Sequence, residues 1–251
     1  MKTLRLSWIT SFAPFLLLVL VLGASAPAAE FPIAKTSGHQ EVSLSAAFDG
    51  TNYLVGILDS VNCPGNQCSS EVTAQLVSAA DGSLVGPRIT TGMTGDVPSV
   101  AFDGTNFLMV WKGEDSTNPL NYYVYGQLFS TLGVLNGSAF PISPVNKIGG
   151  ASDMIKVIYD GANYFVAWED RGDPALQETA KICGQFVAPS GALLGGIIPV
   201  SDPAAQYGQV HPAVAFDGTN IYVVWVDGRN QRACANSTCY PSDIFGQFIT
   251  K

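Results

Sequence analysis

Charged side chains that could bind a ligand gather in the polar stretches between the apolar runs of this sequence. Acids and arginines stand together in two of these stretches, and a histidine precedes the second: Asp170, Arg171, Asp227, Arg229 and His211. Such groups either form ion pairs with each other or offer hydrogen bonds to a polar ligand. We expect ion pairs within these loops, on a surface that binds a ligand. The tripeptide Arg171-Gly172-Asp173 matches the one that integrins read, but the acid–arginine combination recurs, which favours an ion pair.

Three further acids, Glu41, Asp96 and Asp153, stand just before apolar runs at comparable places in the chain. Hard cations prefer carboxylate oxygens, so a ring of these acids would suit Ca2+. Acids in loops are more commonly solvated than metal-bound, and we favour that interpretation. No other cofactor is expected. The sequence also offers no nucleophile–base set that would predict a catalytic residue.

The cysteines form two pairs with equal spacing. Cys63 and Cys68 stand in one polar stretch, and Cys234 and Cys239 stand in another. In an exported protein this spacing predicts a local disulfide in each stretch. A four-cysteine zinc site is the alternative, but the two pairs lie in different repeats, far apart in the sequence. Cys183 falls within an apolar run, which predicts a buried thiol.

A repeat of about 55 residues organises the whole sequence. Each copy begins with Asp-Gly, followed by a small residue and Asn, and carries a bulky residue eight positions after the Asp. The copies begin at Asp49, Asp103, Asp160 and Asp217, and the bulky residues are Ile57, Trp111, Trp168 and Trp225. Each copy later carries a glutamine in an apolar run: Gln75, Gln127, Gln185 and Gln247.

Each repeat predicts four β-strands. Asp-Gly is typical of a tight hairpin turn between the first two strands, because both residues tolerate positive φ. The second and third strands are near-continuous apolar runs, which is typical of strands buried on both faces. Short segments such as Phe140-Pro141-Ile142 and Ile198-Pro199-Val200 predict a fourth strand at the sheet edge, where proline is tolerated. We interpret the tryptophans as core residues between sheets, and the glutamines as residues that bind backbone inside them.

These features predict an all-β fold, a four-bladed β-propeller of four-stranded blades. The last repeat lacks a fourth strand, and Phe31-Pro32-Ile33 near the start is a spare copy of one. We therefore expect the N-terminal strand to close the ring by pairing with the last repeat. An open array whose ends pair between two chains, a strand-swapped oligomer, is the alternative to a closed monomer.

The pattern Asp-Gly-Thr-Asn-Tyr-Leu-Val-x-Trp, then Tyr-Gly-Gln, then Phe-Pro-Ile-Ser resembles a repeat found in secreted and cell-surface bacterial proteins. The resemblance covers nearly all of the chain after residue 29. It implies a propeller-like fold and no particular activity, since most proteins with this repeat have no determined function. The turns are also similar to the Asp-box of sialidases, but no Ser or Thr stands two residues before the Asp.

The N-terminal residues 1–29 predict a secretory signal peptide, leaving residues 30–251 as a single domain of four repeats. Lys2 and Arg5 precede an apolar run that ends in small residues. A secreted protein, extracellular or periplasmic, follows from this interpretation. No second apolar run is long enough to span a membrane. The formal charge of −8 disfavours nucleic acid as a partner, because phosphate backbones repel an acidic surface.

The long connections between second and third strands differ from repeat to repeat. They cover about 59–70, 112–121, 169–180 and 227–242. Long variable connections on one face of a repeat scaffold are typical of a binding face. We therefore predict a secreted, non-catalytic binding or adhesion module for an extracellular protein or glycan. A propeller glycosidase or sialidase-like enzyme and a structural assembly subunit are the alternatives.

Overall fold

The computed structural model describes residues 30–61, 69–115, 118–144, 154–170, 179–205, 207–230 and 242–250. The chain divides after Phe31 into two units, and every strand of the described residues lies in the second, Pro32–Lys251. The described residues form strands and turns and contain no helix, which confirms the all-β prediction. In these ranges, accordingly, no helix has the length and apolarity needed to cross a membrane.

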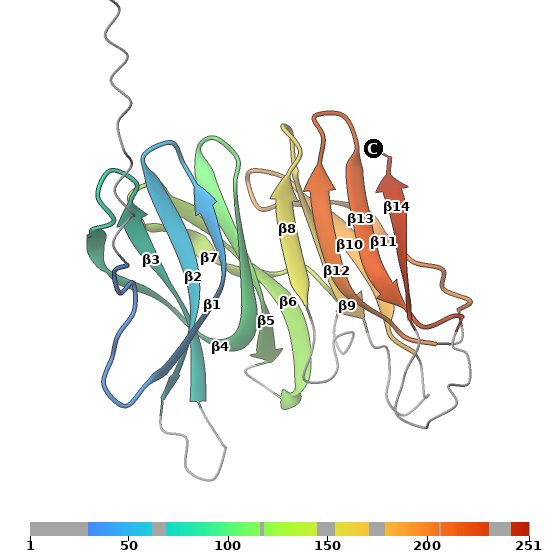
Figure 1. Ribbon diagram of the computed structural model, residues 1–251, viewed down its shortest axis with the longest axis horizontal. Helices are drawn as coiled ribbons and strands as arrows, with labels where there is room; N and C mark the ends of the chain where they lie inside the picture. Colours follow the sequence, from blue (N-terminus) through green and yellow to red (C-terminus); the bar gives the residue numbers. More distant parts are fainter. Residues whose placement is uncertain are drawn as a thin grey trace, which may run out of the picture. The chain divides into compact units, whose positions relative to one another are not determined.

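Strand pairing arranges the second unit into a seven-stranded, a four-stranded and a three-stranded antiparallel sheet that follow one another along the chain (Figure 1). One long strand divides the seven-stranded sheet into two halves, called sheets 1 and 2, and the other two are called sheets 3 and 4. Sheet 1 consists of β1 (Gln40–Phe48), β2 (Asn52–Val61), β3 (Ser69–Ser78) and the first half of β4 (Leu84–Phe102). Sheet 2 consists of the second half of β4, β5 (Asn106–Asp115), β6 (Asn118–Ser130) and β7 (Leu135–Pro141). Sheet 3 consists of β8 (Ile155–Tyr159), β9 (Tyr164–Asp170), β10 (Lys181–Val187) and β11 (Leu193–Pro199). Sheet 4 consists of β12 (Gln209–Phe216), β13 (Ile221–Asp227) and β14 (Asp243–Ile249).

One strand, β4, belongs to two sheets. Its 19 residues pair with β3 as far as Thr94 and with β5 from Gly95 onward. The repeat predicts two separate strands here, the fourth of one copy and the first of the next. The chain instead continues as one strand with a bulge around Gly92, whose φ is 70°, since no proline or Asp-Gly turn interrupts it between Ile89 and Asp96.

The predicted Asp-Gly turn joins the first two strands of every sheet. In each turn an Asp Oδ1 accepts the backbone N–H groups of the residues two and three positions later, at 2.7–2.9 Å. The glycine that follows each Asp has a φ between 88° and 100°, which a side chain would oppose. The same turn is thus built four times, and its chemistry is fully explained by local structure.

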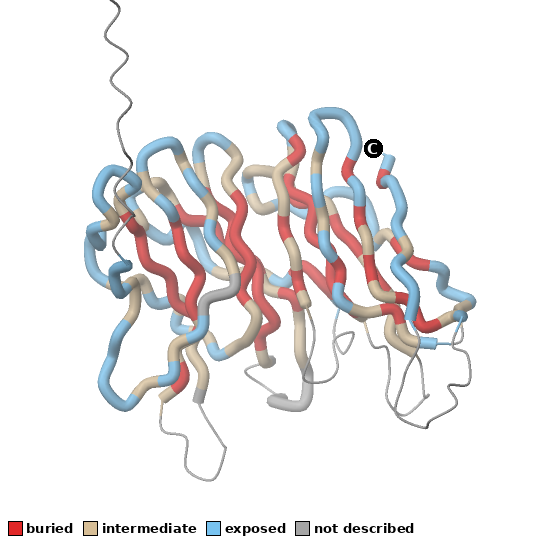
Figure 2. The backbone as a smooth tube through the Cα atoms, in the orientation of Figure 1, coloured by how far each residue is buried: buried red, intermediate tan, exposed pale blue. Residues whose placement is uncertain are grey.

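Three hydrophobic cores lie between neighbouring sheets and confirm the predicted role of the tryptophans. One face of each sheet, called the tryptophan face, carries Trp111, Trp168 or Trp225, each at most 4% exposed, and Ile57 takes this place in sheet 1. In each core the tryptophan face packs against the reverse face of the preceding sheet. Leu54 of sheet 1 thus packs with Trp111 of sheet 2. Figure 2 shows buried residues running through the sheets between exposed turns.

Three of the four glutamines bind backbone inside their sheets, as predicted. The side-chain nitrogens of Gln75, Gln127 and Gln185 donate to carbonyl oxygens of the fourth strand at 2.8–3.3 Å. Gln247 is exposed instead. Its sheet consists of three strands among the described residues, so these carbonyl groups are missing.

The predicted closure of the ring within one chain is wrong for this structure. Among the described residues β14 pairs with β13 only, and no hydrophobic core joins sheet 4 to sheet 1. Ile33 and Ala34 pack instead against Val55, Ile57 and Val77 of sheet 1. The physical reason is that the apolar tryptophan face of sheet 1 lies next to this segment in the sequence, so the segment packs its apolar side chains there.

Candidate binding site at the loop-bearing end

The two ends of the sheets differ in how they are built. The repeated Asp-Gly turns occupy one end, and the variable connections between second and third strands occupy the other, called the loop-bearing end. The predicted connection at 112–121 is shorter than expected, because β5 extends to Asp115 and β6 begins at Asn118. The connections at 62–68, 171–178 and 231–241 lie outside the described residues. The described residues at the loop-bearing end are the strand ends beside these connections.

An aspartate stands at or near the end of the second strand in three sheets. Asp59, Asp170 and Asp227 each stand ten residues after the turn Asp of their repeat, and Gly113 takes this place in sheet 2. Side chains alternate between faces along a strand, so these aspartates share the tryptophan face with the bulky residue two positions earlier. They form the base of the candidate site, and each has different partners.

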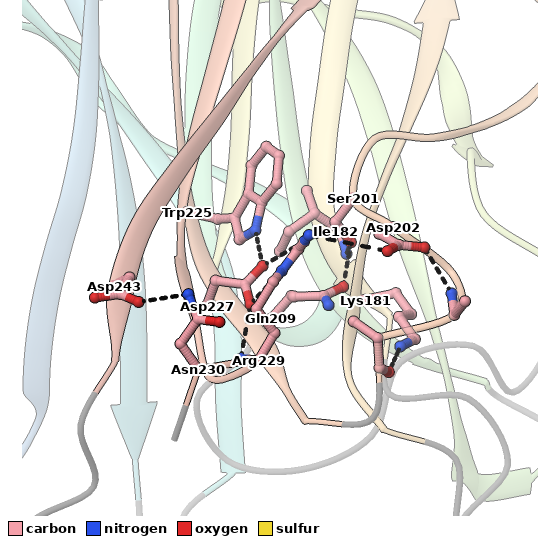
Figure 3. A network of polar contacts seen from close by, with 12 residues as sticks. Lys181, Ile182, Ser201, Asp202, Gln209, Trp225, Asp227, Arg229, Asn230 and Asp243 are labelled. Atoms are coloured by element: carbon pink, nitrogen blue, oxygen red, sulfur yellow. Dashed lines mark hydrogen bonds and ion pairs between the residues drawn. The ribbon is translucent and has the colours of Figure 1, made fainter. Parts of the chain in front are cut away.

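Asp227 is the centre of a polar network in sheet 4 (Figure 3). Its side chain is fully buried and accepts three hydrogen bonds from Arg229, two of them from the guanidinium at 2.7 and 2.9 Å. The indole nitrogen of Trp225 donates to the same carboxylate at 2.9 Å. This confirms the ion pair predicted for Asp227 and Arg229. Arg229 also lies over the ring of Phe245, with its guanidinium carbon 4.2 Å from the ring centre.

The hydrogen bonds to Asp227 decide its charge state. Burial by itself would raise the pKa of this carboxyl group, but the hydrogen bonds from Arg229 and Trp225 outweigh burial and lower it. The same contact raises the pKa of Arg229 above its ordinary value. Asp227 therefore stays ionised at neutral pH and holds the arginine in one orientation.

The network continues across the core into sheet 3. Arg229 lies 3.9 Å from Asp202, and the Ser201 hydroxyl donates to Gln209 Oε1 at 2.5 Å. The side-chain nitrogen of the buried Gln209 has no hydrogen-bond partner among the described residues. Lys181 Nζ donates to the Ala205 carbonyl oxygen, and burial lowers the pKa of this lysine. The junction of sheets 3 and 4 thus holds two cations and one unused amide donor beside the variable connections.

A second polar cluster occupies the same end of sheet 1. Arg88 Nη1 lies 2.7 Å from Glu41 and 2.9 Å from Asp59, while His39 Nδ1 lies 2.6 Å from the other oxygen of Asp59. Burial would raise the pKa of Glu41, but the hydrogen bonds from Arg88 and Thr36 lower it overall. One arginine thus holds two carboxylates together on the tryptophan face.

The structure describes two of the three predicted metal-binding acids, and these two have different partners. Glu41 binds Arg88 and Thr36, and Asp96 accepts the backbone N–H of Val97 at 2.8 Å. Asp153 lies outside the described residues. Within the described part of the chain, no group of three His, Cys, Asp or Glu residues is placed to hold a metal ion. The calcium site stays a prediction.

The other predicted residues have separate surroundings. His211 is exposed and sits in a bulge of β12 with a φ of 57°, as Val97 does in β4 with a φ of 49°. Cys183 is half-buried in β10, less buried than predicted, and its sulfur lies 3.8 Å from Asp170. Arg171 and the four paired cysteines fall outside the described residues, so both disulfides stay predictions.

Sequence reasoning missed several residues of these clusters. Arg88, Asp59, Lys181 and Gln209 carry the polar contacts, yet none was a candidate. One signal was available, because Asp59, Asp170 and Asp227 recur at the same repeat position. Nothing in the sequence predicts that Arg88, far along the chain from both, binds Glu41 and Asp59.

No protein-family model matches the chain, and no curated protein matches it in sequence. Solved structures give weak similarity in fold. A subtype N10 neuraminidase-like protein of A/little yellow-shouldered bat/Guatemala is 12% identical with a TM-score of 0.46, covering 76% of this chain and 55% of its own. The arabinanase Arb43A of Bacillus subtilis is 14% identical with a TM-score of 0.41, covering 80% and 70%. A mutant β-fructofuranosidase of Microbacterium saccharophilum is 10% identical with a TM-score of 0.41, covering 82% and 54%. This chain thus spans about half the length of the first and third, and similarity at this level says nothing about activity.

Proposed function

We propose that the chain is a secreted binding module with propeller-like architecture, whose ligand surface is the loop-bearing end of its sheets. The difference between the two ends supports this function. The Asp-Gly end repeats one turn four times with the same hydrogen bonds. The opposite end carries the variable connections and different polar clusters in sheets 1 and 4.

The charge states of the acids favour binding over general acid catalysis. A general acid must hold a proton near neutral pH, which requires a raised pKa. The pKa values of Glu41 and Asp227 are lowered by their arginine partners instead. Carboxylates held in this state orient arginine side chains, and guanidinium groups suit the recognition of carboxylate or hydroxyl groups on a glycan or protein.

Exposed side chains at the two ends provide the test. His211 and Asn230 are exposed at the loop-bearing end, while Thr105 and Thr219 are exposed in Asp-Gly turns. The chain would be screened on immobilised glycans and on extracellular proteins, and binding to the best partner would be measured by surface plasmon resonance. We expect His211→Ala and Asn230→Ala to weaken binding, and Thr105→Ala and Thr219→Ala to leave it unchanged. Loss of binding in the turn variants alone would contradict the proposal.

A further inference from the structure

Every core between sheets is formed by the same two surfaces. The tryptophan face of one sheet meets the reverse face of the sheet before it, in sheets 1 and 2, 2 and 3, and 3 and 4. Among the described residues, two surfaces of these types meet no neighbouring sheet. They are the reverse face of sheet 4 and the tryptophan face of sheet 1, where Val55, Ile57 and Val77 are buried and pack against Ile33 and Ala34. Each surface is the complement of the other.

The reverse face of sheet 4 is apolar and exposed. Ile244 and Phe248 on β14 are 71% and 58% exposed, and Tyr222 on β13 stacks beside Phe248 at 4.7 Å between ring centres. Ile182 of sheet 3 holds the repeat position of Ile244 and is fully buried. The exposure of sheet 4 therefore results from a missing neighbour and not from a change in residue type.

The edge of sheet 4 is also incomplete. In sheets 2 and 3 the residue after the fourth strand binds the backbone of the third strand. The N–H of Ile142 donates to the Val124 carbonyl oxygen at 2.7 Å in sheet 2, and the N–H of Val200 donates to the Ile182 carbonyl oxygen at 2.9 Å in sheet 3. Ile244 is the residue of β14 that corresponds to Val124 and Ile182. Gln247, which would bind a fourth strand, is exposed.

Sheet 1 carries the counterpart of this missing segment. Ile142 lies in the core beside Trp168 of the next sheet, and Val200 lies in the core beside Trp225. Ile33, in the matching Pro-Ile sequence, packs in the same way beside Ile57 of sheet 1. Ile33 thus takes the position that the end of a preceding sheet would take, although no preceding sheet is present in the described residues.

We propose that a second copy of the chain supplies this sheet. The reverse face of sheet 4 in one copy covers the tryptophan face of sheet 1 in the other, and Pro32-Ile33 of the latter runs along the β14 edge of the former. The contact continues an interface that the chain already forms three times. Each copy carries both surfaces. In a dimer, sheet 4 of each copy therefore meets sheet 1 of the other, and these two head-to-tail contacts close the assembly. A second copy is the expected occupant because, among the described residues of one chain, neither strand pairing nor a hydrophobic core joins sheet 4 to sheet 1.

Light scattering coupled to size exclusion tests the proposal with a matched set of variants. The wild-type chain should elute with twice the mass of one chain. Ile244→Asp and Phe248→Asp place a charge on the proposed contact and should give monomers. Leu132→Asp is the control, because Leu132 is 84% exposed in the turn after β6 and belongs to neither surface. A monomeric wild-type chain, or dimers that survive both aspartate variants, would overturn the proposal.

Cysteine cross-linking distinguishes contact between copies from closure within one chain. Ile33→Cys and Ile244→Cys would be made in separate, differently tagged chains, which are then mixed under mild oxidation. We expect a disulfide between the two tags. A disulfide that forms only when both cysteines are on one chain would show closure within a single copy and refute the second-copy contact.

Discussion

Asp227 shows how one residue orders a whole cluster. Its carboxylate accepts from Trp225 in the core and from the half-buried Arg229, so it connects an indole to a guanidinium. Removing one member of an ion pair with a buried partner costs more than removing one member of an exposed pair, because the remaining group loses its hydrogen bonds.

We expect Asp227→Asn to lower the free energy of unfolding by about 1–3 kcal/mol at neutral pH. The folded pKa of Asp227 lies below its ordinary value of 3.8. Its contribution is therefore fully present above the unfolded pKa and is lost as pH falls through the lower, folded pKa. Urea unfolding of wild type and variant at pH 7, 5 and about 3 would measure the difference.

The control for this variant is Asp243→Asn, which changes an exposed carboxylate that accepts a hydrogen bond from the Asn230 side chain at 2.9 Å. It should leave stability within about 0.5 kcal/mol of wild type. A difference between Asp227→Asn and wild type that stays constant down to the lowest pH would show that charge is not the source of the stabilisation.

Gly95 marks the place where β4 leaves one sheet for the next. A Cβ there would lie 2.5 Å from the Lys112 carbonyl oxygen and 2.5 Å from Trp111 Cδ1. We expect Gly95→Ala to destabilise the protein by about 1–3 kcal/mol through overpacking. Gly196 in β11 has no atom within 4 Å of the same position, so Gly196→Ala should be nearly neutral. Thermal unfolding of both variants would check this, and equal melting temperatures would contradict the predicted crowding.

At the scale of elements, the sequence predicts the turns and strands that each repeat forms from its own residues. The Asp-Gly turns, the apolar second and third strands and the buried tryptophans follow from residue type and spacing alone. Glutamine binding to the fourth strand was also predictable, because a buried amide needs partners. Gln247 departs from its repeat equivalents because it depends on a strand that the sheet lacks.

What the sequence could not predict depends on contacts between distant residues. The Arg88 cluster joins β1, β2 and β4, and no spacing rule connects Arg88 to Glu41. The closure of the array was wrongly predicted, because the count of strands per repeat says nothing of the distance between the first and last sheets. The continuous β4 was missed because the repeat boundaries suggested a break.

Ala34 offers a test at this scale that strengthens the proposed contact between copies. Ser143 and Ser201 follow Ile142 and Val200, and each hydroxyl accepts a backbone N–H of the third strand at 2.8 Å. Ala34 follows Ile33 and has no hydroxyl. We expect Ala34→Ser to supply the missing acceptor and to tighten dimer formation about two- to tenfold, as one added hydrogen bond would.

Analytical ultracentrifugation over a dilution series would measure this gain. Ala34→Val, which adds bulk but no acceptor, is the matched control and should not tighten the dimer. If the serine and valine variants both dissociate like wild type, Ala34 does not lie on the β14 edge of another copy.

At the scale of the molecule, the chain is an array in which each sheet contacts its neighbours. The free energy of unfolding of such an array is approximately the sum of contributions from each sheet and from each core between sheets. The two terminal surfaces face no neighbouring sheet, and in repeat proteins they usually carry polar residues. Here they remain apolar, with Ile244 and Phe248 exposed on one of them.

The shared strand β4 gives the array an uneven mechanical character. Breaking the hydrogen bonds between β4 and β3 also disturbs those between β4 and β5, because one continuous strand forms both sets without a linker. Sheets 1 and 2 are thereby expected to open as one cooperative block, with their amide protons exchanging together. Sheets 3 and 4 are joined by the turn-containing segment 200–208 and have no such common strand. The weakest point of the array under load should accordingly lie outside the block of sheets 1 and 2.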